Sequence, residues 1–297
     1  MPVFRSAVAL VVSIASLACR DSAGSRPAAT APRDDFGFAI RVTAAPPRRI
    51  VSLNPSTTEI LFAIGAGPRV VGRSRYDDFP KAARDVPDLG PALQPNVEAI
   101  LEVHPDLVIL YGSAENRPAA ERLLQARVPV LGLRFDRIEQ FERDARLLGR
   151  VTGDSATAAV LVDTIAATLA RVQSATRSLP RPTVFMHAWD RPIIAIGGGS
   201  FLSELLDIAG ARNVYADVRD PSAVVTLEDV VRRDPDIVLV SPAAAPVVRS
   251  SARWQAVPAV RAGRVLVYDT LLVGRPSVTL GAAAVSLARL IHPGSVP

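Results

Sequence analysis

The chain has 297 residues, of which 49% are hydrophobic and 21% are charged. That much apolar surface can be buried, so disorder of most of the chain is excluded, and the length predicts two globular units or one large one. The net charge of +5 at pH 7 comes mostly from arginines that are scattered without a basic run. A nucleic-acid-binding protein gathers its cations into a patch, so nucleic acid is not expected as a partner.

The first residues have the pattern of an export signal. A short positive start is followed by an apolar stretch over residues 6–18, which is too short to remain as a transmembrane helix. Residues 1–18 are therefore predicted to be a signal peptide. Cys19 is the only cysteine of the chain, and residues 16–19 (SLAC) are similar to the bacterial lipobox, with Ser where Leu is usual.

Lipid attachment at Cys19 would place the protein in the periplasm or at the cell surface, with the membrane as a partner only through the anchor. Residues 19–35 are polar and rich in Ala, Pro and Ser, so a flexible tether is expected there. Apolar residues then alternate as in a strand at Phe38, Ile40 and Val42. Without a second cysteine, an exported protein depends on its core for stability.

Short apolar runs alternate with helical stretches in the rest of the chain. Residues 50–53 are predicted to form a strand and residues 55–64 a helix that ends at a glycine. Residues 97–103 are predicted to be helical, and the fully apolar residues 107–110 are typical of a strand inside a parallel sheet. This alternation predicts an α/β fold.

An internal repeat divides the chain. VEAILEVHPDLVIL begins at Val97 and LEDVVRRDPDIVLV begins at Leu227, and their matching residues are 228 − 98 = 130 positions apart. A second pair of segments has an offset of 204 − 59 = 145. Two copies are too few for a solenoid and instead predict two similar lobes. The matching pairs are Glu98 and Glu228, Pro105 and Pro235, Asp106 and Asp236, Glu59 and Glu204, and Gly65 and Gly210.

A long helix is predicted between the two copies. Residues 154–179 carry apolar residues at helical spacing with no internal glycine or proline. At 1.5 Å per residue, a helix of ~25 residues reaches nearly 40 Å, which is enough to span two lobes. The predicted organisation is an N-terminal α/β lobe over residues 36–152, a connecting helix over residues 153–179 and a C-terminal α/β lobe over residues 180–297.

At these residues the chain resembles the periplasmic binding proteins that deliver cobalamin, haem or ferric siderophores to ABC importers, and the cobalamin-binding branch most of all. The resemblance covers residues 36–291 and rests on RIVSLNPSTTEILFAIGAGPRVVG, YDDFP, PNVEAILEVHPDLVI and GGGSFLSELLDIAGARNVYAD. It implies two Rossmann-like lobes joined by one long helix, with the ligand in the cleft between them and small hinge motion. It also implies a monomer that is not an enzyme, has no resident cofactor and docks on the permease dimer of an importer.

Five residues are the candidate ligand contacts, on loops expected at the carboxyl ends of strands. Tyr76 matches a tyrosine that contacts the corrin in cobalamin-binding relatives, and Tyr111 matches a cleft aromatic. Trp189, Leu272 and Arg275 complete the set, although core packing is an alternative for the aromatic residues. Aromatic faces suit a large planar ligand, so cobalamin is the expected ligand. A ferric siderophore is the first alternative, and haem comes after it because no haem ligand of the family's kind is evident.

The sequence departs from the cobalamin-binding pattern at several positions. Ala92 and Ser222 stand at positions where tryptophans occur in those relatives, and residues 271–272 (LL) replace a polar-aromatic pair. His187 could face the cleft, but a structural role is the more common one for a single histidine. Residues 197–200 (GGGS) lack the lysine of a phosphate-binding loop and are predicted to be a turn before a helix.

Glu98 and Glu228 are the candidate docking residues. Each opens a predicted helix, where a carboxylate is favoured for local reasons alone. The repeat puts one such carboxylate on each lobe, and in cobalamin-binding relatives these positions meet arginines of the permease.

The sequence disfavours two other classes of function, an enzyme and a structural envelope lipoprotein. An enzyme is disfavoured because the sequence has no Gly-x-Ser-x-Gly motif and no candidate cysteine nucleophile. The three histidines have no metal-ligand spacing, so no metal site is expected. A structural envelope lipoprotein would not need the paired glutamates or the cleft aromatics.

Overall fold

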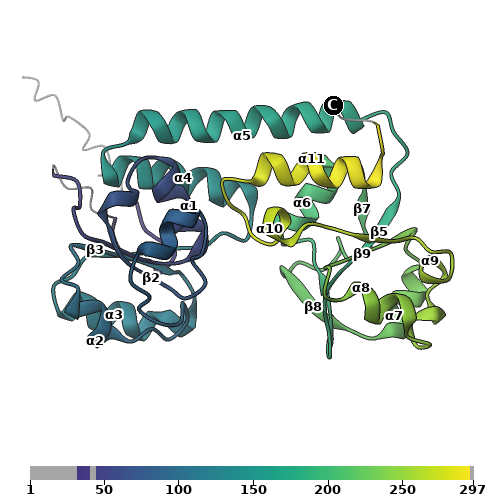
Figure 1. Cartoon of the computed structure of the whole chain (residues 1–297), viewed down its shortest axis with the longest axis horizontal. Coiled ribbons are helices and arrows are strands. Elements are labelled where there is room, and N and C mark those ends of the chain that lie inside the picture. Colours follow the sequence, from purple (N-terminus) through teal and green to yellow (C-terminus); the bar gives the residue numbers. More distant parts are fainter. Residues whose placement is uncertain (1–31, 41–44, 295–297) are drawn as a thin grey trace, which may run out of the picture. The chain divides into compact units, whose positions relative to one another are not determined.

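The computed structural model describes residues 32–40 and 45–294, and a compact unit begins at Arg33. Within that unit, Figure 1 shows an N-terminal lobe and a C-terminal lobe, with α5 (Ser155–Thr176) running along both. The N-terminal lobe contains β1 (Ile50–Leu53), α1 (Pro55–Ala63), β2 (Val70–Arg73), α2 (Val97–Glu102), β3 (Leu107–Tyr111), α3 (Arg117–Gln125), β4 (Val130–Leu133) and α4 (Ile138–Thr152). The C-terminal lobe contains β5 (Thr183–Asp190), β6 (Ile193–Ile196), α6 (Phe201–Ile208), β7 (Arg212–Asn213), β8 (Ser222–Val225), α7 (Leu227–Arg233), β9 (Ile237–Val240), α8 (Ala245–Ser250), α9 (Pro258–Arg261), β10 (Val265–Val267), α10 (Thr270–Val273) and α11 (Leu280–Ile291).

Each lobe is built on its own sheet. The N-terminal sheet is parallel throughout, in the order β2-β1-β3-β4. The C-terminal sheet has the order β10-β9-β5-β6-β8, in which β10, β9 and β5 are parallel and β6 and β8 pair antiparallel. Apolar strands such as β1 and β3 are buried on both faces, as a parallel sheet covered by helices requires. The predicted α/β fold of two lobes is confirmed.

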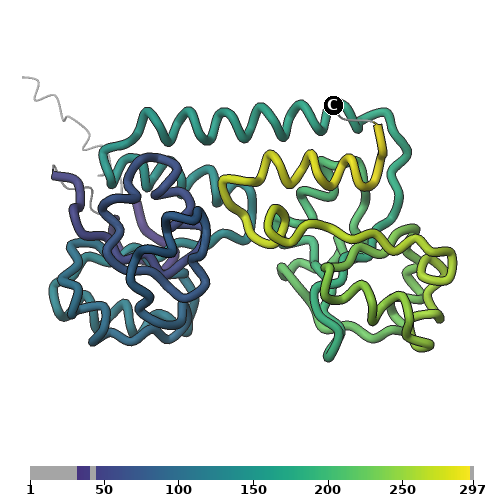
Figure 2. Tube along the Cα trace, viewed as in Figure 1, coloured from purple at the N-terminus to yellow at the C-terminus, as the bar shows by residue number. Residues whose placement is uncertain are grey.

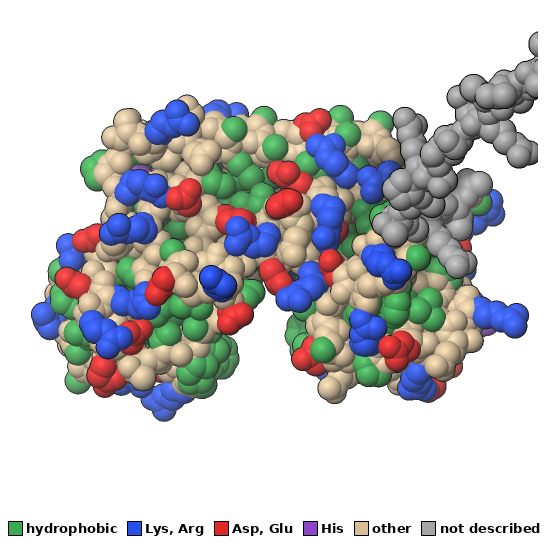
Figure 3. All heavy atoms as spheres, turned by 180° about the vertical axis from the view of Figure 1, so that it is seen from behind, with side chains coloured by type: hydrophobic (Ala, Val, Ile, Leu, Met, Phe, Trp, Pro, Cys, Tyr) green, Lys and Arg blue, Asp and Glu red, His purple; other side chains and the backbone are tan. Residues whose placement is uncertain are grey.

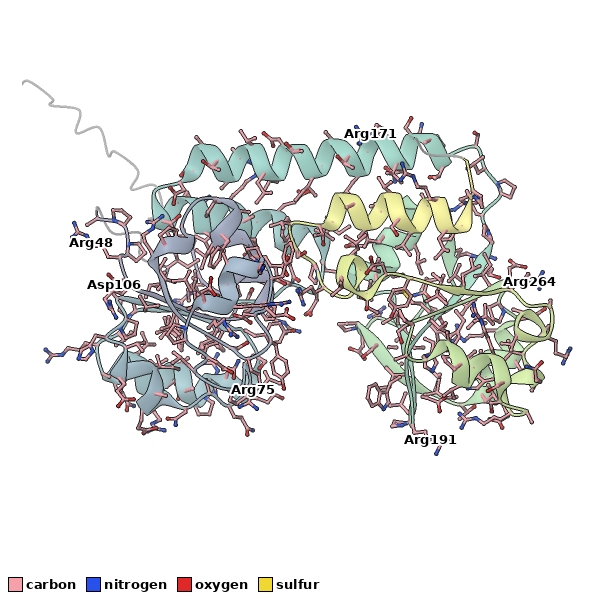
Figure 4. The ribbon with its side chains drawn as sticks, viewed as in Figure 1. Arg48, Arg75, Asp106, Arg171, Arg191 and Arg264 are labelled. Atoms are coloured by element: carbon pink, nitrogen blue, oxygen red, sulfur yellow. The ribbon has the colours of Figure 1, made fainter. Side chains whose placement is uncertain are left out.

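The repeated aspartates have the same structural task in both lobes. The carboxylate of Asp106 accepts hydrogen bonds from the backbone N–H groups of Arg48 and Arg49 at 2.8 and 2.9 Å, just before β1; Figure 4 shows Asp106 beside Arg48. The carboxylate of Asp236 accepts bonds from the backbone N–H and the hydroxyl of Thr183, the first residue of β5, both at 2.8 Å. Each aspartate therefore fastens the start of a neighbouring parallel strand.

The predicted connecting helix is α5. It begins directly after Gly153 and Asp154, and Gly153 has the positive φ of 80° that ends α4. Figure 2 shows α11 lying along α5, and α5 also contacts α4. Of the described helices, only α5 is long and apolar enough to cross a membrane by length and composition. Its inner stripe packs into a hydrophobic cluster that also takes residues from β1, α4, α6 and α11, so the two lobes share one apolar core.

The start of the folded unit differs from the predicted strand around Phe38. Asp34 is buried, and its carboxylate accepts hydrogen bonds from the backbone N–H groups of Phe36, Phe38 and Gly132. Asp34 thereby holds the chain in a turn, because a short acidic side chain competes with strand pairing for nearby N–H groups. The backbone of residues 33–35 is thus attached to the N-terminal lobe, and residues 41–44 lie outside the described residues.

Candidate ligand-binding cleft

A groove separates the two lobes, as Figure 3 shows from behind. A hollow of about 470 Å³ is lined from both lobes, by Arg134, Asp136 and Arg137 on one side and by Gly199, Arg219 and Pro221 on the other. In open α/β sheets, ligands bind outside the carboxyl ends of the parallel strands. Ligand contacts are therefore expected on the loops that follow the strands of both sheets.

The N-terminal wall carries exposed apolar side chains on two loops. Tyr76 is 58% exposed on the loop that follows β2, and Phe79 on the same loop is also exposed. Leu93 is exposed on the loop that precedes α2. Among the described residues of this lobe, only Leu124 on α3 is another exposed large hydrophobic residue. Exposed apolar side chains are candidates for a binding surface, and of these three the sequence indicates only Tyr76.

A buried carboxylate holds the loop of Tyr76 in place. Asp77 is buried, and its carboxylate accepts hydrogen bonds from the hydroxyl groups of Ser74 and Thr58, each at 2.6 Å. Thr58 belongs to α1, so these bonds fasten the loop to the helix that follows β1. Burial raises the pKa of Asp77 to about 6, while the hydrogen bonds from Ser74 and Thr58 partly oppose the rise.

Replacing Asp77 by asparagine should flatten the pH dependence of folding. A carboxyl group whose pKa is raised by folding stabilises the native state below its unfolded pKa, and this contribution is lost as the pH rises through the folded value of about 6. Between pH 5 and pH 7 the wild-type chain should therefore lose about 1 kcal/mol of unfolding free energy through Asp77. Denaturant unfolding of wild type and Asp77→Asn at both pH values measures the difference.

Asp217→Asn is the matched control for that measurement. An ion pair with Arg233 lowers the pKa of Asp217, so this carboxyl group is ionised throughout the same range. Its replacement should leave the pH dependence unchanged. If Asp77→Asn and wild type lose equal stability between pH 5 and pH 7, the protonation assigned to Asp77 is wrong.

Tyr111 is half-buried at the end of β3, and its hydroxyl is already engaged. It donates a hydrogen bond to Asp136 Oδ1 at 3.0 Å, which ties the loop after β3 to the loop after β4. The amide of the buried Asn116 donates to the carbonyl oxygens of Ala92 and Tyr111, at 3.0 Å each. Tyr111 can therefore offer only part of its ring to a ligand, and it also supports the loop that carries Leu93.

The C-terminal wall is an apolar row across three strands. Trp189 pairs with Ile194, and Ile194 pairs with Val224, so these side chains lie on one face of the antiparallel part of the sheet. Trp189 is 62% exposed and Val224 is 69% exposed. Figure 1 shows β8 on the side of its lobe that faces the N-terminal lobe. This apolar row (Trp189, Ile194 and Val224) is the main candidate contact surface of the C-terminal lobe.

Trp189 was expected on a loop after a strand, but it lies within β5, which continues to Asp190 because β6 pairs with its second half. Val224 is a candidate that the sequence analysis does not include. Its exposed position in the alternating strand β8 could have indicated a surface row, but the pairing partner could not be read from one sequence.

The predicted contacts Leu272 and Arg275 lie near α10. Leu272 is half-buried against the shared core, whereas the neighbouring Leu271 is exposed. Arg275 is already paired, because its Nε donates to Glu59 Oε1 at 2.5 Å. Its Nη2 also lies 3.7 Å from Asp78 Oδ1. Arg275 therefore links the segment after α10 to the N-terminal lobe, which is a structural role.

His187 lies inside the C-terminal lobe. It is 2% exposed and packs edge-on against Trp254, with the ring centres 5.5 Å apart. Burial lowers the pKa of His187. Neither ring nitrogen has a hydrogen-bond partner within the described residues, and Nε2 is 3.8 Å from Asp190. The histidine is thus a buried structural residue, without the hydrogen bond that such residues usually have.

The glycine-rich segment at residues 197–200 forms the predicted turn. A Cβ atom on Gly197, Gly198 or Gly199 would come within 2.2 Å of a backbone oxygen of residues 216–220, so only glycine fits there. Ser200 then caps α6 by accepting a hydrogen bond from the backbone N–H of Leu202.

Glu98 and Glu228 lie in the first turns of α2 and α7, and both are exposed. The backbone N–H at each helix start lowers the pKa of both carboxyl groups, and Arg122 adds to the effect at Glu98. Glu98 forms an ion pair with Arg122 on α3 at 2.5 Å. Glu228 forms no ion pair with any residue that the structure describes, and it borders a hollow of about 430 Å³ that Arg191 and Arg253 also line.

Two α/β lobes joined by one long helix, with apolar side chains on both walls of the groove between them, define a two-lobe solute-binding protein. The chain belongs to the periplasmic binding protein family, whose family model matches residues 50–271. This is a family of transport proteins that bind solutes, and not a class of enzymes.

Curated relatives support this placement. The chain is 25% identical over 243 residues to a vitamin B12-binding protein of Vibrio parahaemolyticus, covering 82% of this chain and 88% of the relative. It is 28% identical over 207 residues to a vitamin B12-binding protein of Yersinia pestis, covering 69% of this chain and 74% of the relative.

Solved structures share the fold. The periplasmic vitamin B12-binding protein BtuF of Vibrio cholerae has a TM-score of 0.74 at 23% identity, covering 83% of this chain and 97% of that one. The periplasmic heme-binding protein RhuT of Roseiflexus sp. RS-1 also has a TM-score of 0.74 at 23% identity, with 84% and 99% coverage.

Proposed function

We propose that this protein captures a corrinoid outside the cytoplasm and delivers it to the permease of an ABC importer. The observation that carries the proposal is the similarity to vitamin B12-binding proteins over most of the chain. The exposed Tyr76 and the apolar row on β5, β6 and β8 support it, because such surfaces suit the faces of a large, partly apolar ligand. We assign Tyr76, Trp189 and Leu271 as ligand contacts, with Tyr111, Leu272 and Arg275 supporting them.

Titration of the purified protein tests the ligand assignment. Calorimetry with cyanocobalamin, haem and a panel of ferric siderophores should give binding by the corrinoid at micromolar protein. Haem is the second candidate, because a haem-binding protein shares this fold with an equal TM-score. Binding of haem or of a siderophore without binding of cyanocobalamin would contradict the corrinoid proposal and leave the transport class intact.

We further propose that the mature protein is held at the membrane by lipid on Cys19, a residue that lies outside the described residues. Cys19→Ser should release the protein from the membrane fraction into the soluble periplasmic fraction or the medium. Fractionation followed by immunoblotting measures the change. A serine variant that stays in the membrane fraction to the same extent as the wild type would contradict the anchor.

We also propose that Glu98 and Glu228 dock the protein on the permease, one on each lobe. They occupy equivalent helix starts, are exposed and are ionised at neutral pH. Charges at the rim of an interface set orientation and association rate more than affinity. The two sites differ, because Arg122 already neutralises Glu98 while Glu228 is free of such a partner among the described residues.

A further inference from the structure

Two glutamates that match in the internal repeat, Glu59 and Glu204, both reach across from their own lobe. Glu59 lies on α1 and accepts the hydrogen bond from Arg275, which follows the last strand of the C-terminal lobe, at 2.5 Å. Glu204 lies on α6 and pairs with Arg137 at 2.5 Å, just before α4 of the N-terminal lobe. One contact therefore joins a glutamate of the N-terminal lobe to an arginine of the C-terminal lobe, and the other joins a glutamate of the C-terminal lobe to an arginine of the N-terminal lobe.

The Glu204 contact is reinforced by the backbone. Glu204 Oε2 accepts a hydrogen bond from the backbone N–H of Ile138 at 2.8 Å, so one carboxylate holds both the side chain and the main chain at the start of α4. Arg137 also donates to the carbonyl oxygen of Gly198 at 3.1 Å. The backbone N–H of Phe201 donates to the carbonyl oxygen of Asp136 at 2.6 Å. Together these bonds join the glycine-rich turn to the loop after β4.

The Glu59 contact is buried. Glu59 is 2% exposed, and burial raises its pKa while the guanidinium of Arg275 opposes the rise. A buried carboxylate that is paired in this way is strongly bound to its partner, because separating them would leave a charge without compensation. Arg275 also lies 3.7 Å from Asp78, on the loop that carries Tyr76 and Phe79. The contact thus connects the lobe junction with the loop of the proposed ligand contacts.

We propose that Glu59 and Glu204 are positioning residues that fix the separation of the two lobes at which the groove holds its ligand. The polar contacts at both glutamates are 2.5–2.8 Å long: a hydrogen bond from Arg275 to Glu59, an ion pair between Arg137 and Glu204, and a hydrogen bond from Ile138 to Glu204. A small shift of one lobe against the other therefore breaks them. The shared apolar core along α5 and α11 limits large motion, and the two glutamates define the position within that limit. The effect on ligand binding rests on the proposed function, whereas the effect on lobe separation does not.

Interlobe distances test the proposal without any ligand. In a Cys19→Ser background, Gln125→Cys on α3 and Ala262→Cys after α9 give one spin-label site on each lobe. Pulsed EPR should show a narrow distance distribution in this reference protein. The distribution should broaden with Glu204→Gln and with Glu59→Gln, which keep the side-chain size and remove the charge. Asp217→Asn, which breaks an ion pair inside one lobe, is the control and should leave the distribution unchanged.

Ligand kinetics provide the second readout. Each glutamine variant should release the bound corrinoid about tenfold faster, with little change in the association rate. The lobes of the variant are held less firmly at the separation that encloses the ligand, and differences in affinity between related proteins lie mostly in the dissociation rate. Unchanged distance distributions in both glutamine variants, even with lowered thermal stability, would overturn the proposal and leave the ion pairs with a structural role only. Failure of the proposed function would be recognised separately, as absence of ligand binding by the wild-type protein.

Discussion

Trp189→Ala is expected to weaken corrinoid binding by roughly 10- to 100-fold, the loss typical of removing an aromatic anchor from an interface. Trp189 is 62% exposed and forms the apolar row with Ile194 and Val224, so its ring is available to cover a ligand face. Its indole N–H donates to the carbonyl oxygen of Arg191 at 3.2 Å, which fixes the ring within the hairpin of β5 and β6. Calorimetric titration with cyanocobalamin measures the loss.

Matched variants distinguish a loss of ligand contact at Trp189 from a loss of folding stability. Trp189→Phe should retain most of the affinity because it keeps an aromatic face, and Val160→Ala removes an equally exposed apolar side chain from α5, away from both walls of the groove. Trp189→Ala and Val160→Ala should each change the unfolding free energy by less than about 0.5 kcal/mol, since exposed side chains contribute little to stability. If Trp189→Ala binds the corrinoid with wild-type affinity, the apolar row is not part of the ligand site.

The fold was predictable because its strongest features are local or repeated. Fully apolar strands, helix starts and the repeat around Asp106 and Asp236 are each visible as short sequence patterns. The structure shows that the two aspartates have the same role, since each binds the start of a neighbouring strand. The antiparallel addition of β6 and β8 was not predictable, because strand pairing joins residues that are distant in sequence. The turn at Asp34 was also missed, since its side chain captures backbone N–H groups that a strand would use.

The site was predictable where a rare residue type marks it. Aromatic residues make up only 5% of the chain, so Tyr76 and Trp189 are distinctive in the sequence. The task of Arg275 could not be inferred, because its partner Glu59 is 216 positions away and is buried on the other lobe. An exposed aliphatic residue such as Leu271 carries no distinguishing sequence pattern, and the alternation around Val224 does not show which strand pairs with β8, so the structure is needed to find both residues.

Replacing both Glu98 and Glu228 by alanine should leave ligand affinity nearly unchanged and lower importer-dependent uptake at least roughly tenfold. Each carboxylate lies at the start of a helix on a different lobe and projects into solvent, so the pair can meet two cations on a dimeric permease. The losses should differ between the single variants. Glu228→Ala should lower uptake more than Glu98→Ala, because Arg122 already compensates the charge of Glu98.

Uptake of labelled corrinoid, ATPase stimulation in reconstituted importer and calorimetric affinity distinguish docking from a local helix-start role. Arg122→Ala serves as the matched variant, because it removes the ion-pair partner of Glu98. In this background, Glu98→Ala should lower uptake more than it does when Arg122 is present. The helix starts themselves should survive all of these changes, because Asn96 and Thr226 cap them independently of the glutamates. A docking charge acts on the permease and leaves the groove unchanged. The docking assignment would therefore be contradicted by a double variant that transports at the wild-type rate. It would also be contradicted by a double variant that loses ligand affinity in parallel with transport.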